Sequence, residues 1–321
     1  MARAWRIEYE GAYYHLLSRG NERRDIFRAD ADRGLFLETL GEGCERFGIE
    51  LFAYVLMPNH YHLLIRTRQA NLSRAMHWFS GTYTRRFNNR HARSGHLFQG
   101  RFKSILVQND AYVMQLSCYI HRNPLRAGLV QRLADYPWSS YSIYAYGQEP
   151  PDWLSTQLIL SQFNAPNPHR AYREKVQGYS QEEKRLWEDF RHGFILGSKK
   201  FVASVRNRFL PEHPAAAIPE QLRLARDKEL HTILKAAADQ LGCDLSRLIA
   251  ERRVSGVEKE KRDVLIYWVW KAGLLTNEQV GTLFGLTYSA VSHSVQEMKK
   301  KLRSDKELST VFGRLNSQFK L

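Results

Sequence analysis

The sequence predicts an α+β fold: an antiparallel sheet with helices on one face, followed by an all-α region. Two β-rich runs separated by Pro58-Asn59 predict a hairpin, and helical and strand patterns alternate before Gly147. Beyond that glycine the patterns are helical and are interrupted by prolines. We therefore expect a first domain at 1–147, a connector with helical segments at 148–219 and a helical domain at 220–321.

Strand and helix patterns in the first domain give the order β-α-β-β-α-β-α, which resembles a split β-α-β sandwich. Asp110 can cap the last helix, which we expect to end near Asn123-Pro124, because the residue before a proline is pushed out of the α region. The expected strands are 12–18, 50–57, 60–67 and 102–108, and the two earlier helices are 30–47 and 72–88.

The connector and the last domain are predicted to be mainly helical. Prolines bracket a short segment at 153–163, a helical amphipathic stretch is expected at 170–210, and Pro211, Pro214 and Pro219 mark a second break. Further helical stretches are expected around 220–241, 244–252 and 258–272.

A helix-turn-helix is predicted at about 276–302. Val280 and Phe284 face inward on its first helix, and Gly285 permits a tight turn. On the second helix the outward residues are Ser289, Ser292, His293 and Gln296. Such a helix places its early residues in the major groove of DNA. The alternative is an ordinary helical hairpin.

Charge points to a polyanionic partner. Lysine and arginine total 48 against 33 acidic residues, which gives a net charge of +15 and a pI of about 9.8. This excess favours nucleic acid first and an anionic membrane surface second. The window 51–109 holds nine basic and nine aromatic residues and no acidic one. Cations neutralise phosphates while rings stack on bases, so this window favours single-stranded nucleic acid; the alternative is core rings beside a solvated face.

Composition excludes several classes of protein. No apolar run approaches the ~20 residues that span a bilayer, and the N-terminus lacks an apolar signal core. The three cysteines, Cys44, Cys118 and Cys243, are scattered, which argues against a disulfide framework and fits a reducing cytosol. We therefore expect a cytoplasmic protein without a membrane partner.

A candidate catalytic cluster combines two histidines, a tyrosine and an asparagine. His60 and His62 lie two apart on a predicted strand, so their imidazoles share a face and can bind one divalent cation. Tyr119 and Asn123 lie four apart on a predicted helix, and the Asn123 carboxamide could complete a His-His-Asn site. Mixed nitrogen and oxygen ligands suit Mg²⁺ or Mn²⁺, while Zn²⁺ stays possible. Each pattern alone also fits ordinary packing.

The cluster would support attack on a phosphodiester. A cation there polarises the non-bridging oxygen, and Tyr119 would be the nucleophile, giving a 5′-phosphotyrosyl enzyme and a free 3′-hydroxyl.

Several ordered motifs resemble a known family. The segment from Pro58 to His62 is similar to the HUH motif of single-tyrosine transposases, and the segment from Tyr119 to Val130 resembles the nucleophile helix of the REP-associated tyrosine transposases. Further similar segments are 18–21, 100–104 and 136–141. The resemblance covers about residues 8–147.

This resemblance implies a ferredoxin/RRM-like HUH domain in a bacterial, nucleoid-associated enzyme. It implies a metal-dependent nickase and ligase of single-stranded DNA that acts at hairpins of repetitive extragenic palindromes, without a small-molecule substrate. Asn123 stands where many insertion-sequence relatives carry glutamine. Because the asparagine side chain is shorter, whether Asn123 would bind the metal directly or through a water molecule stays open. Matching segments make four residues plausible DNA contacts: Arg19, Asn21, Arg101 and Lys103. The stretch from about Glu258 is similar to the DNA-binding domain of the bacterial replication initiator.

Three hypotheses remain open from the sequence. The favoured one is a DNA strand transferase that uses Tyr119. The second is a non-catalytic DNA-binding regulator derived from a transposase, and the third is a metal-dependent hydrolase in which Tyr119 is only structural. Whether the protein acts as a monomer or a dimer is also open.

Overall fold

A computed structural model describes residues 5–108, 111–179, 182–211, 218–251, 254–271 and 275–318. The chain separates into two units, Met1–Gln221 and Leu222–Leu321. The expected cap at Asp110 and the expected break at Pro214 lie outside the described residues. Within the described ranges, no helix has both the length and the apolar character needed to cross a membrane.

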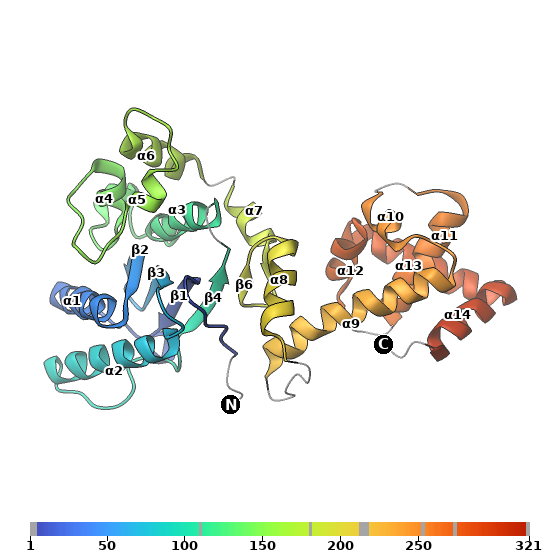
Figure 1. Cartoon of the computed structure of the whole chain (residues 1–321), viewed down its shortest axis with the longest axis horizontal. Coiled ribbons are helices and arrows are strands. Elements are labelled where there is room, and N and C mark those ends of the chain that lie inside the picture. Colours follow the sequence, from blue (N-terminus) through green and yellow to red (C-terminus); the bar gives the residue numbers. More distant parts are fainter. Residues whose placement is uncertain are drawn as a thin grey trace. The chain divides into compact units, whose positions relative to one another are not determined.

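The first unit mixes strands and helices, as the sequence predicts (Figure 1). Two short 3-10 helices, Asn21–Arg23 and Leu133–Asp135, also lie in this unit. Its strands and helices in chain order are β1 (Tyr13–Arg19), α1 (Asp30–Phe47), β2 (Ile49–Met57), β3 (His60–Thr67), α2 (Leu72–Arg90), β4 (Lys103–Val107), α3 (Ala111–Arg126), α4 (Tyr141–Tyr146), α5 (Gln157–Leu160), α6 (Pro168–Gly178), α7 (Glu183–Glu188), β5 (Phe190–Arg191), β6 (Ile195–Leu196) and α8 (Lys199–Phe209).

The six strands form one sheet in the order β2-β3-β1-β4-β6-β5. All neighbouring strands pair antiparallel except β4 and β6, which pair parallel. The sequence did not predict β5 and β6, because two-residue strands carry no alternating pattern, and the segment 170–210 was expected to be helical. The expected connector therefore adds the far edge of the sheet.

Helices cover both faces of this sheet, so the expectation of helices on one face was wrong. On one face, Tyr61 of β3 packs against Phe36 of α1 and Phe79 of α2. On the other face, Val55 and Leu64 share a buried cluster with residues of α3. The cause is visible in β2, where every residue from Leu51 to Met57 is buried. A strand that is apolar on both sides must be covered on both sides.

Local signals fix the ends of several elements. Asp32 accepts hydrogen bonds from the backbone N–H groups of Arg28 (2.8 Å) and Ala29 (3.0 Å), which satisfies donors at the start of α1. Gly48 ends that helix with φ of 61°, a left-handed conformation that favours glycine. The helix and the following hairpin therefore begin and end close to the predicted positions.

Helix α3 continues past its proline, contrary to the expected end near Asn123-Pro124. Pro124 has no N–H group, so it cannot donate to the carbonyl of Ile120. Asn123 compensates, because its Nδ2 donates to Ile120 O (3.2 Å) and to Tyr119 O (2.9 Å). The helix therefore extends to Arg126.

The second unit is helical and has its own core. Trp268, Phe284, Val291 and Val295 are buried together. The sequence did not predict the last helix, α14. The helices of this unit, with the one that leads into it, are α9 (Pro219–Gln240), α10 (Leu245–Ala250), α11 (Gly256–Lys271), α12 (Asn277–Phe284), α13 (Tyr288–Ser304) and α14 (Lys306–Gln318).

A tight turn joins α12 to α13. Gly285 has φ of 66°, and a Cβ atom added to Gly281 would lie 2.6 Å from the carbonyl oxygen of Leu286. Both positions therefore require glycine, one for conformation and one for close approach. Thr276 and Thr287 cap the two helices through their side-chain oxygens.

A buried histidine on α3 gives a pH prediction for the first unit. His121 is fully buried and hydrogen bonds to Tyr172 (2.6 Å) and Ser140 (2.7 Å), and burial lowers its pKa to about 3. The unfolded chain takes up this proton near pH 6.5, so the contribution of the neutral ring is present above pH 6.5 and is lost as pH falls toward 3. Acidification from pH 7 to pH 5 should cost about 2 kcal/mol through this group.

The variant His121→Gln should lack this pH-dependent contribution. We expect the difference in unfolding free energy between wild type and variant to narrow by about 2 kcal/mol from pH 7 to pH 5. Urea unfolding at the two pH values measures it. A difference that stays constant would contradict the assignment of a neutral buried His121.

Candidate active site

One face of the sheet gathers the predicted histidine pair and two predicted DNA contacts. His62 pairs with Leu17 across β1, and His60 pairs with Arg19. Leu17 in turn pairs with Lys103 of β4. Directly paired residues point to the same face, so the two imidazoles, Arg19 and Lys103 share it. Lys103 lies two strands from His62, about 10 Å by strand spacing.

Tyr119 reaches this face from α3. Its ring centroid lies 6.2 Å from that of His62 and 6.1 Å from that of His15. The Arg126 guanidinium lies 4.8 Å from the centroid of the same ring, and Trp187 of α7 packs edge-on at 4.8 Å. The structure therefore brings the tyrosine and the histidine pair together.

His60 is held in one tautomer. Its Nδ1 lies 2.7 Å from the Oδ1 of Asn59, and the Nδ2 of Asn59 donates to the carbonyl of Arg23 at 2.9 Å. Because an amide oxygen only accepts, Nδ1 of His60 carries the proton and Nε2 carries the lone pair. Burial, together with the Arg19 charge, lowers the pKa of His60 to about 4. The ring is therefore neutral near pH 7 and can act as a ligand through Nε2.

His62 is more deeply placed, with 7% of its surface exposed. Its Nδ1 lies 2.8 Å from Nε2 of His15. Burial lowers the pKa of His62 well below its usual value, and the nearby His15, His60, Arg126 and Arg19 lower it further. Since Nδ1 is engaged by His15, Nε2 is the nitrogen that remains for a ligand.

Asn123 differs from the simple expectation for a metal ligand. Its amide nitrogen is bonded to the backbone of its own helix, where it compensates for Pro124. Its side chain is 9% exposed. The carboxamide therefore has a structural role in α3, and only its oxygen is left for a cation or a water.

The other predicted DNA contacts on the first unit are exposed. Arg19 is the last residue of β1, Asn21 begins the 3-10 helix that follows it, and Arg101 lies in the loop before β4. The two segments are joined, because Gln99 N donates to Arg19 O and Asn21 N donates to Leu97 O, both at 2.9 Å. These residues therefore form one surface at the histidine end of the sheet.

The turn after β1 is strained. Glu22 and Arg23 both have positive φ, at 54° and 61°, although neither is glycine. Backbone bonds attach this turn to the β2–β3 turn, from Gly20 N to Asn59 O and from Ile26 N to Pro58 O. The strained conformation therefore depends on the segment that holds His60.

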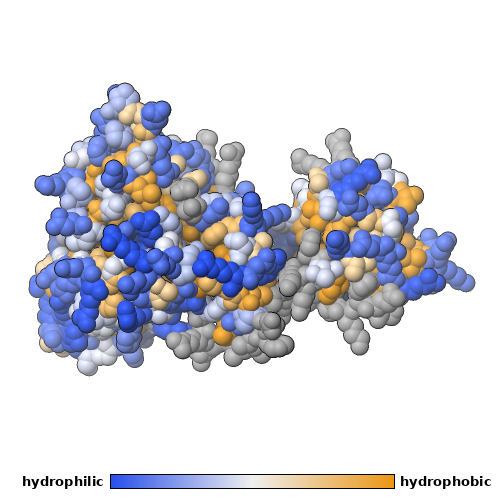
Figure 2. Space-filling view, viewed as in Figure 1, coloured by the Kyte–Doolittle hydropathy of each residue, from blue (hydrophilic) through white to orange (hydrophobic). Residues whose placement is uncertain are grey.

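Figure 2 shows one face of the molecule coloured by hydropathy, and on this face apolar residues occur in groups between hydrophilic ones.

On α13 of the second unit, Ser289, His293 and Gln296 are exposed, as predicted. Ser292 is half-buried, and its Oγ accepts a hydrogen bond from Asn277 of α12 at 3.0 Å. Ser292 therefore joins the two helices, and its predicted outward position is only partly realised.

Sequence reasoning missed three residues that surround the cluster: His15, Arg126 and Trp187. His15 carried a usable signal, since it lies on the predicted strand 12–18, four residues before Arg19, and an even spacing places two residues on the same face of a continuing strand. Trp187 lies on the short helix α7, far along the chain, and nothing in its local sequence indicated a place in the cluster. Arg126 also pairs with Glu183 of α7 at 2.9 Å, so α7 contacts the cluster through two of its residues.

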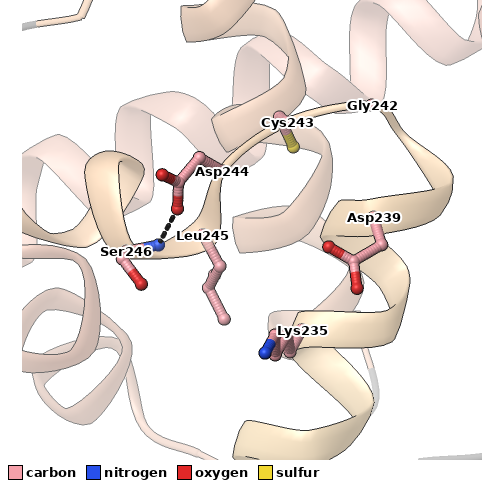
Figure 3. A pocket seen from close by; sticks show the side chains of 7 residues that line it. All are labelled: Lys235, Asp239, Gly242, Cys243, Asp244, Leu245 and Ser246. Carbon is pink, nitrogen blue, oxygen red and sulfur yellow. Dashed lines mark hydrogen bonds between the residues drawn. The ribbon is translucent and has the colours of Figure 1, made fainter.

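A cavity of about 440 Å³ lies elsewhere, in the second unit (Figure 3). Asp244 there accepts hydrogen bonds from Ser246 N and Arg247 N, which caps α10, and the Cys243 thiol donates to Ala238 O. These contacts are structural. Within the described ranges, no three His, Cys, Asp or Glu side chains are gathered to hold a metal.

Comparisons with known proteins point to one family. Residues 8–123 match the family model described as Transposase IS200 like. A Haemophilus influenzae protein assigned to the REP-associated tyrosine transposases is 26% identical over 117 aligned residues, and the match covers 33% of this chain and 66% of that protein. A solved REP-associated tyrosine transposase bound to a REP hairpin is 19% identical with a TM-score of 0.40, covering 48% of this chain and 92% of that one.

Over residues 8–123, the first unit is therefore similar to the transposase class. Residues 8–123 are similar to the IS200-like transposase family, and the chain is similar there to a REP-associated tyrosine transposase. The aligned part spans slightly less than two thirds of the Haemophilus relative.

Proposed function

We propose that this protein is a metal-dependent nickase and strand transferase of single-stranded DNA, acting at hairpin-forming palindromic repeats. The observation that carries the proposal is the approach of Tyr119 on α3 to His62 on β3, with 6.2 Å between ring centroids. The Tyr119 ring lies beside neutral imidazoles on a face that also carries Arg19 and Lys103. The name of the Haemophilus relative supports the palindromic target.

The residues fit a divalent cation. His60 and His62 are neutral near pH 7, and each has Nε2 free of the hydrogen bond that its Nδ1 makes. Asn123 Oδ1, directly or through water, would add an oxygen donor. Two imidazoles with oxygen donors suit Mn²⁺ or Mg²⁺. The cation would polarise a non-bridging phosphate oxygen.

Tyr119 would act as the nucleophile. Its phenolic oxygen forms a bond to phosphorus and loses its proton, while the bond from phosphorus to the 3′-oxygen breaks and that oxygen takes up a proton. The products are a 5′-phosphotyrosyl protein and a free 3′-hydroxyl, so rejoining needs no nucleotide cofactor. Arg126, held over the Tyr119 ring, adds positive charge beside the attacking group.

A covalent adduct tests this proposal. The full-length protein is incubated with Mn²⁺ and labelled hairpins that carry single-stranded flanks, and the products are separated on a denaturing gel. We expect a protein–DNA band that EDTA abolishes and whose linked peptide contains Tyr119. Cutting without an adduct would instead support the metal-dependent hydrolase.

We further propose that α12 and α13 form a helix-turn-helix that binds the duplex stem. The geometry that supports it is the three-residue turn 285–287 and the exposed residues at the start of α13. Tyr288, at 64% exposure, extends that surface. The second unit would then hold the stem while the first acts on the single strand.

The double variant His293→Ala with Gln296→Ala should weaken hairpin binding and spare short single strands. Each lost base contact costs about 1–3 kcal/mol, so we expect at least a tenfold loss for the hairpin. Fluorescence anisotropy with both oligonucleotides measures it. Thr310→Ala, also exposed but on α14, is the matched control. Equal losses on hairpin and single strand would contradict this division of roles.

A further inference from the structure

Three arginines line a cavity of the first unit that lies outside the candidate active site. The cavity has a volume of about 310 Å³ and lies where α3, α4, α6 and the 3-10 helix Leu133–Asp135 come together (Figure 1). Arg122 lines it from α3, Arg132 from the position before the 3-10 helix, and Arg173 from α6. Among the described residues that line the cavity, none is acidic. We call these three residues the cavity arginines.

Arg122 is the most buried of the cavity arginines, and most of its donors are unused. The residue is 8% exposed, and its Nη1 donates to the carbonyls of Val176 (2.8 Å) and Gln177 (3.2 Å) near the end of α6. Its Nε is buried without a hydrogen-bond partner among the described residues, and Nη2 donates to none of them. Contact with the end of α6 therefore accounts for only the Nη1 donors of this guanidinium.

The unused donors of Arg122 have the geometry that suits an oxyanion. The Nε–H and an adjacent Nη–H of a guanidinium form a planar fork that matches two oxygens of a phosphate or a carboxylate. A buried charged group without partners is unfavourable, and like charges around one cavity add to that cost. A bound anion would relieve both.

Neighbouring cations on the same helices are paired with acidic residues. Arg126 of α3 pairs with Glu183, and Arg170 of α6 pairs with Glu174, both at 2.9 Å. Among the described residues, no ion pair involves a cavity arginine. The nearby acidic residues are therefore engaged elsewhere, and the cavity keeps its positive charge.

An aromatic ring at the same cavity indicates which anion would fit. Tyr146 of α4 lines the cavity and is 46% exposed, and the Arg173 guanidinium lies 5.2 Å from the centroid of its ring. An exposed ring beside cations is typical of sites that hold nucleotides, because the ring stacks on a base while the cations bind the phosphate. This combination favours a phosphate over a carboxylate.

We propose that the cavity arginines form a phosphate-binding site, in which Arg122 is the buried residue. The ligand is a phosphate group, carried either by a DNA strand or by a free phosphate ion or nucleotide. The volume of about 310 Å³ is at the lower end of the range for small-ligand sites, which suits one phosphate with an adjacent sugar or base. The inference goes beyond the proposed function, because this site needs neither a divalent cation nor the Tyr119 hydroxyl.

The experiment compares variants of the full-length protein. Arg132→Gln and Arg173→Gln, made singly and together, remove cations from an exposed and a half-buried position, so the fold should be retained, and thermal unfolding checks this. Arg170→Gln is the matched control, because Arg170 is exposed on α6 and does not line the cavity. All solutions contain EDTA, so that no divalent cation contributes.

Two ligands distinguish the sources of the phosphate. Equilibrium dialysis with radiolabelled inorganic phosphate measures binding of the free ion. Fluorescence anisotropy with a labelled thymidine oligonucleotide, at several NaCl concentrations, measures binding of a DNA strand and its dependence on salt.

If a DNA strand supplies the phosphate, each single variant should lower the slope of log affinity against log salt by about 0.7, and Arg170→Gln should keep the wild-type slope. If the source is a free phosphate or nucleotide, that slope stays unchanged in all variants. The double variant should then bind inorganic phosphate at least about tenfold more weakly than wild type, and Arg170→Gln should stay within about twofold. Either pattern supports a phosphate site and identifies its source.

Two results would overturn the proposal. Losses as large in Arg170→Gln would show that these arginines act only through general surface charge. A double variant equal to wild type with both ligands would leave Arg122 as a residue that only stabilises the end of α6. Neither measurement involves DNA cleavage, so the phosphate site and the proposed function can each fail without the other.

Discussion

Tyr119→Phe should abolish covalent attachment of DNA and lower strand cleavage by at least about 10³-fold, because it removes the one oxygen that can attack phosphorus. The ring itself stays, so its packing against Trp187 and beneath Arg126 should be retained. Hairpin affinity and Mn²⁺ affinity should therefore change little. The measurement is single-turnover cleavage of a labelled hairpin in Mn²⁺, with adduct and cut strand quantified on one denaturing gel.

Tyr112→Phe is the matched control. Tyr112 lies on the same helix, and its hydroxyl donates to Asp189 at 2.7 Å, away from the histidine pair. This variant also loses one phenolic oxygen, but it should cleave as wild type does. If Tyr119→Phe cuts as fast as wild type, Tyr119 is structural and water is the nucleophile. If neither the wild type nor any variant cuts, the hypothesis of a non-catalytic DNA-binding regulator survives.

Elements with strong local signals could be predicted from the sequence almost to the residue. Asp30–Phe47 ends at a glycine in the left-handed region, and His60–Thr67 begins directly after the turn at Pro58-Asn59. These signals lie within a few residues of the boundary they determine. The mixed α+β character of the first unit follows from them.

Features that depend on distant contacts could not be predicted. The strands β5 and β6 have two residues each. They form because β6 pairs in parallel with β4. The extension of α3 past Pro124 depends on a side-chain bond from Asn123 rather than on propensity. The unbroken apolar run in β2 indicates that both faces of the sheet are covered, but we expected helices on one face only.

The candidate site also has features that local sequence patterns predict and features that depend on distant contacts. The shared face of His60 and His62 follows from strand alternation alone, and their meeting with Tyr119 agrees with the expected geometry. His15 enters only because β1 lies between β3 and β4, and the order of strands in a sheet is not a local property. The roles of Tyr119, His60, His62 and Asn123 stay predictions.

His62→Ala should separate metal-dependent chemistry from DNA binding. Removing one of two nitrogen ligands should lower cleavage at limiting Mn²⁺ by about 10²–10³-fold, since a bound cation contributes several kcal/mol to stabilising the transition state. Hairpin binding in EDTA should be nearly unchanged, because that affinity comes mainly from basic and exposed residues such as Arg19 and Lys103. Titration of Mn²⁺ against cleavage rate, with anisotropy in EDTA, measures both.

The Mn²⁺ titration also identifies the cause of any loss. If His62 is a ligand, the variant needs a higher Mn²⁺ concentration for half-maximal rate and recovers partly as Mn²⁺ rises. If His62 only supports packing, the rate falls at every concentration by the same factor, in line with the loss of thermal stability, and ligation is contradicted. His77→Ala, an exposed histidine on α2, should leave the titration unchanged. A neutral ligand pair that loses one member should therefore show a shifted Mn²⁺ midpoint, and this midpoint distinguishes ligation from packing at His62.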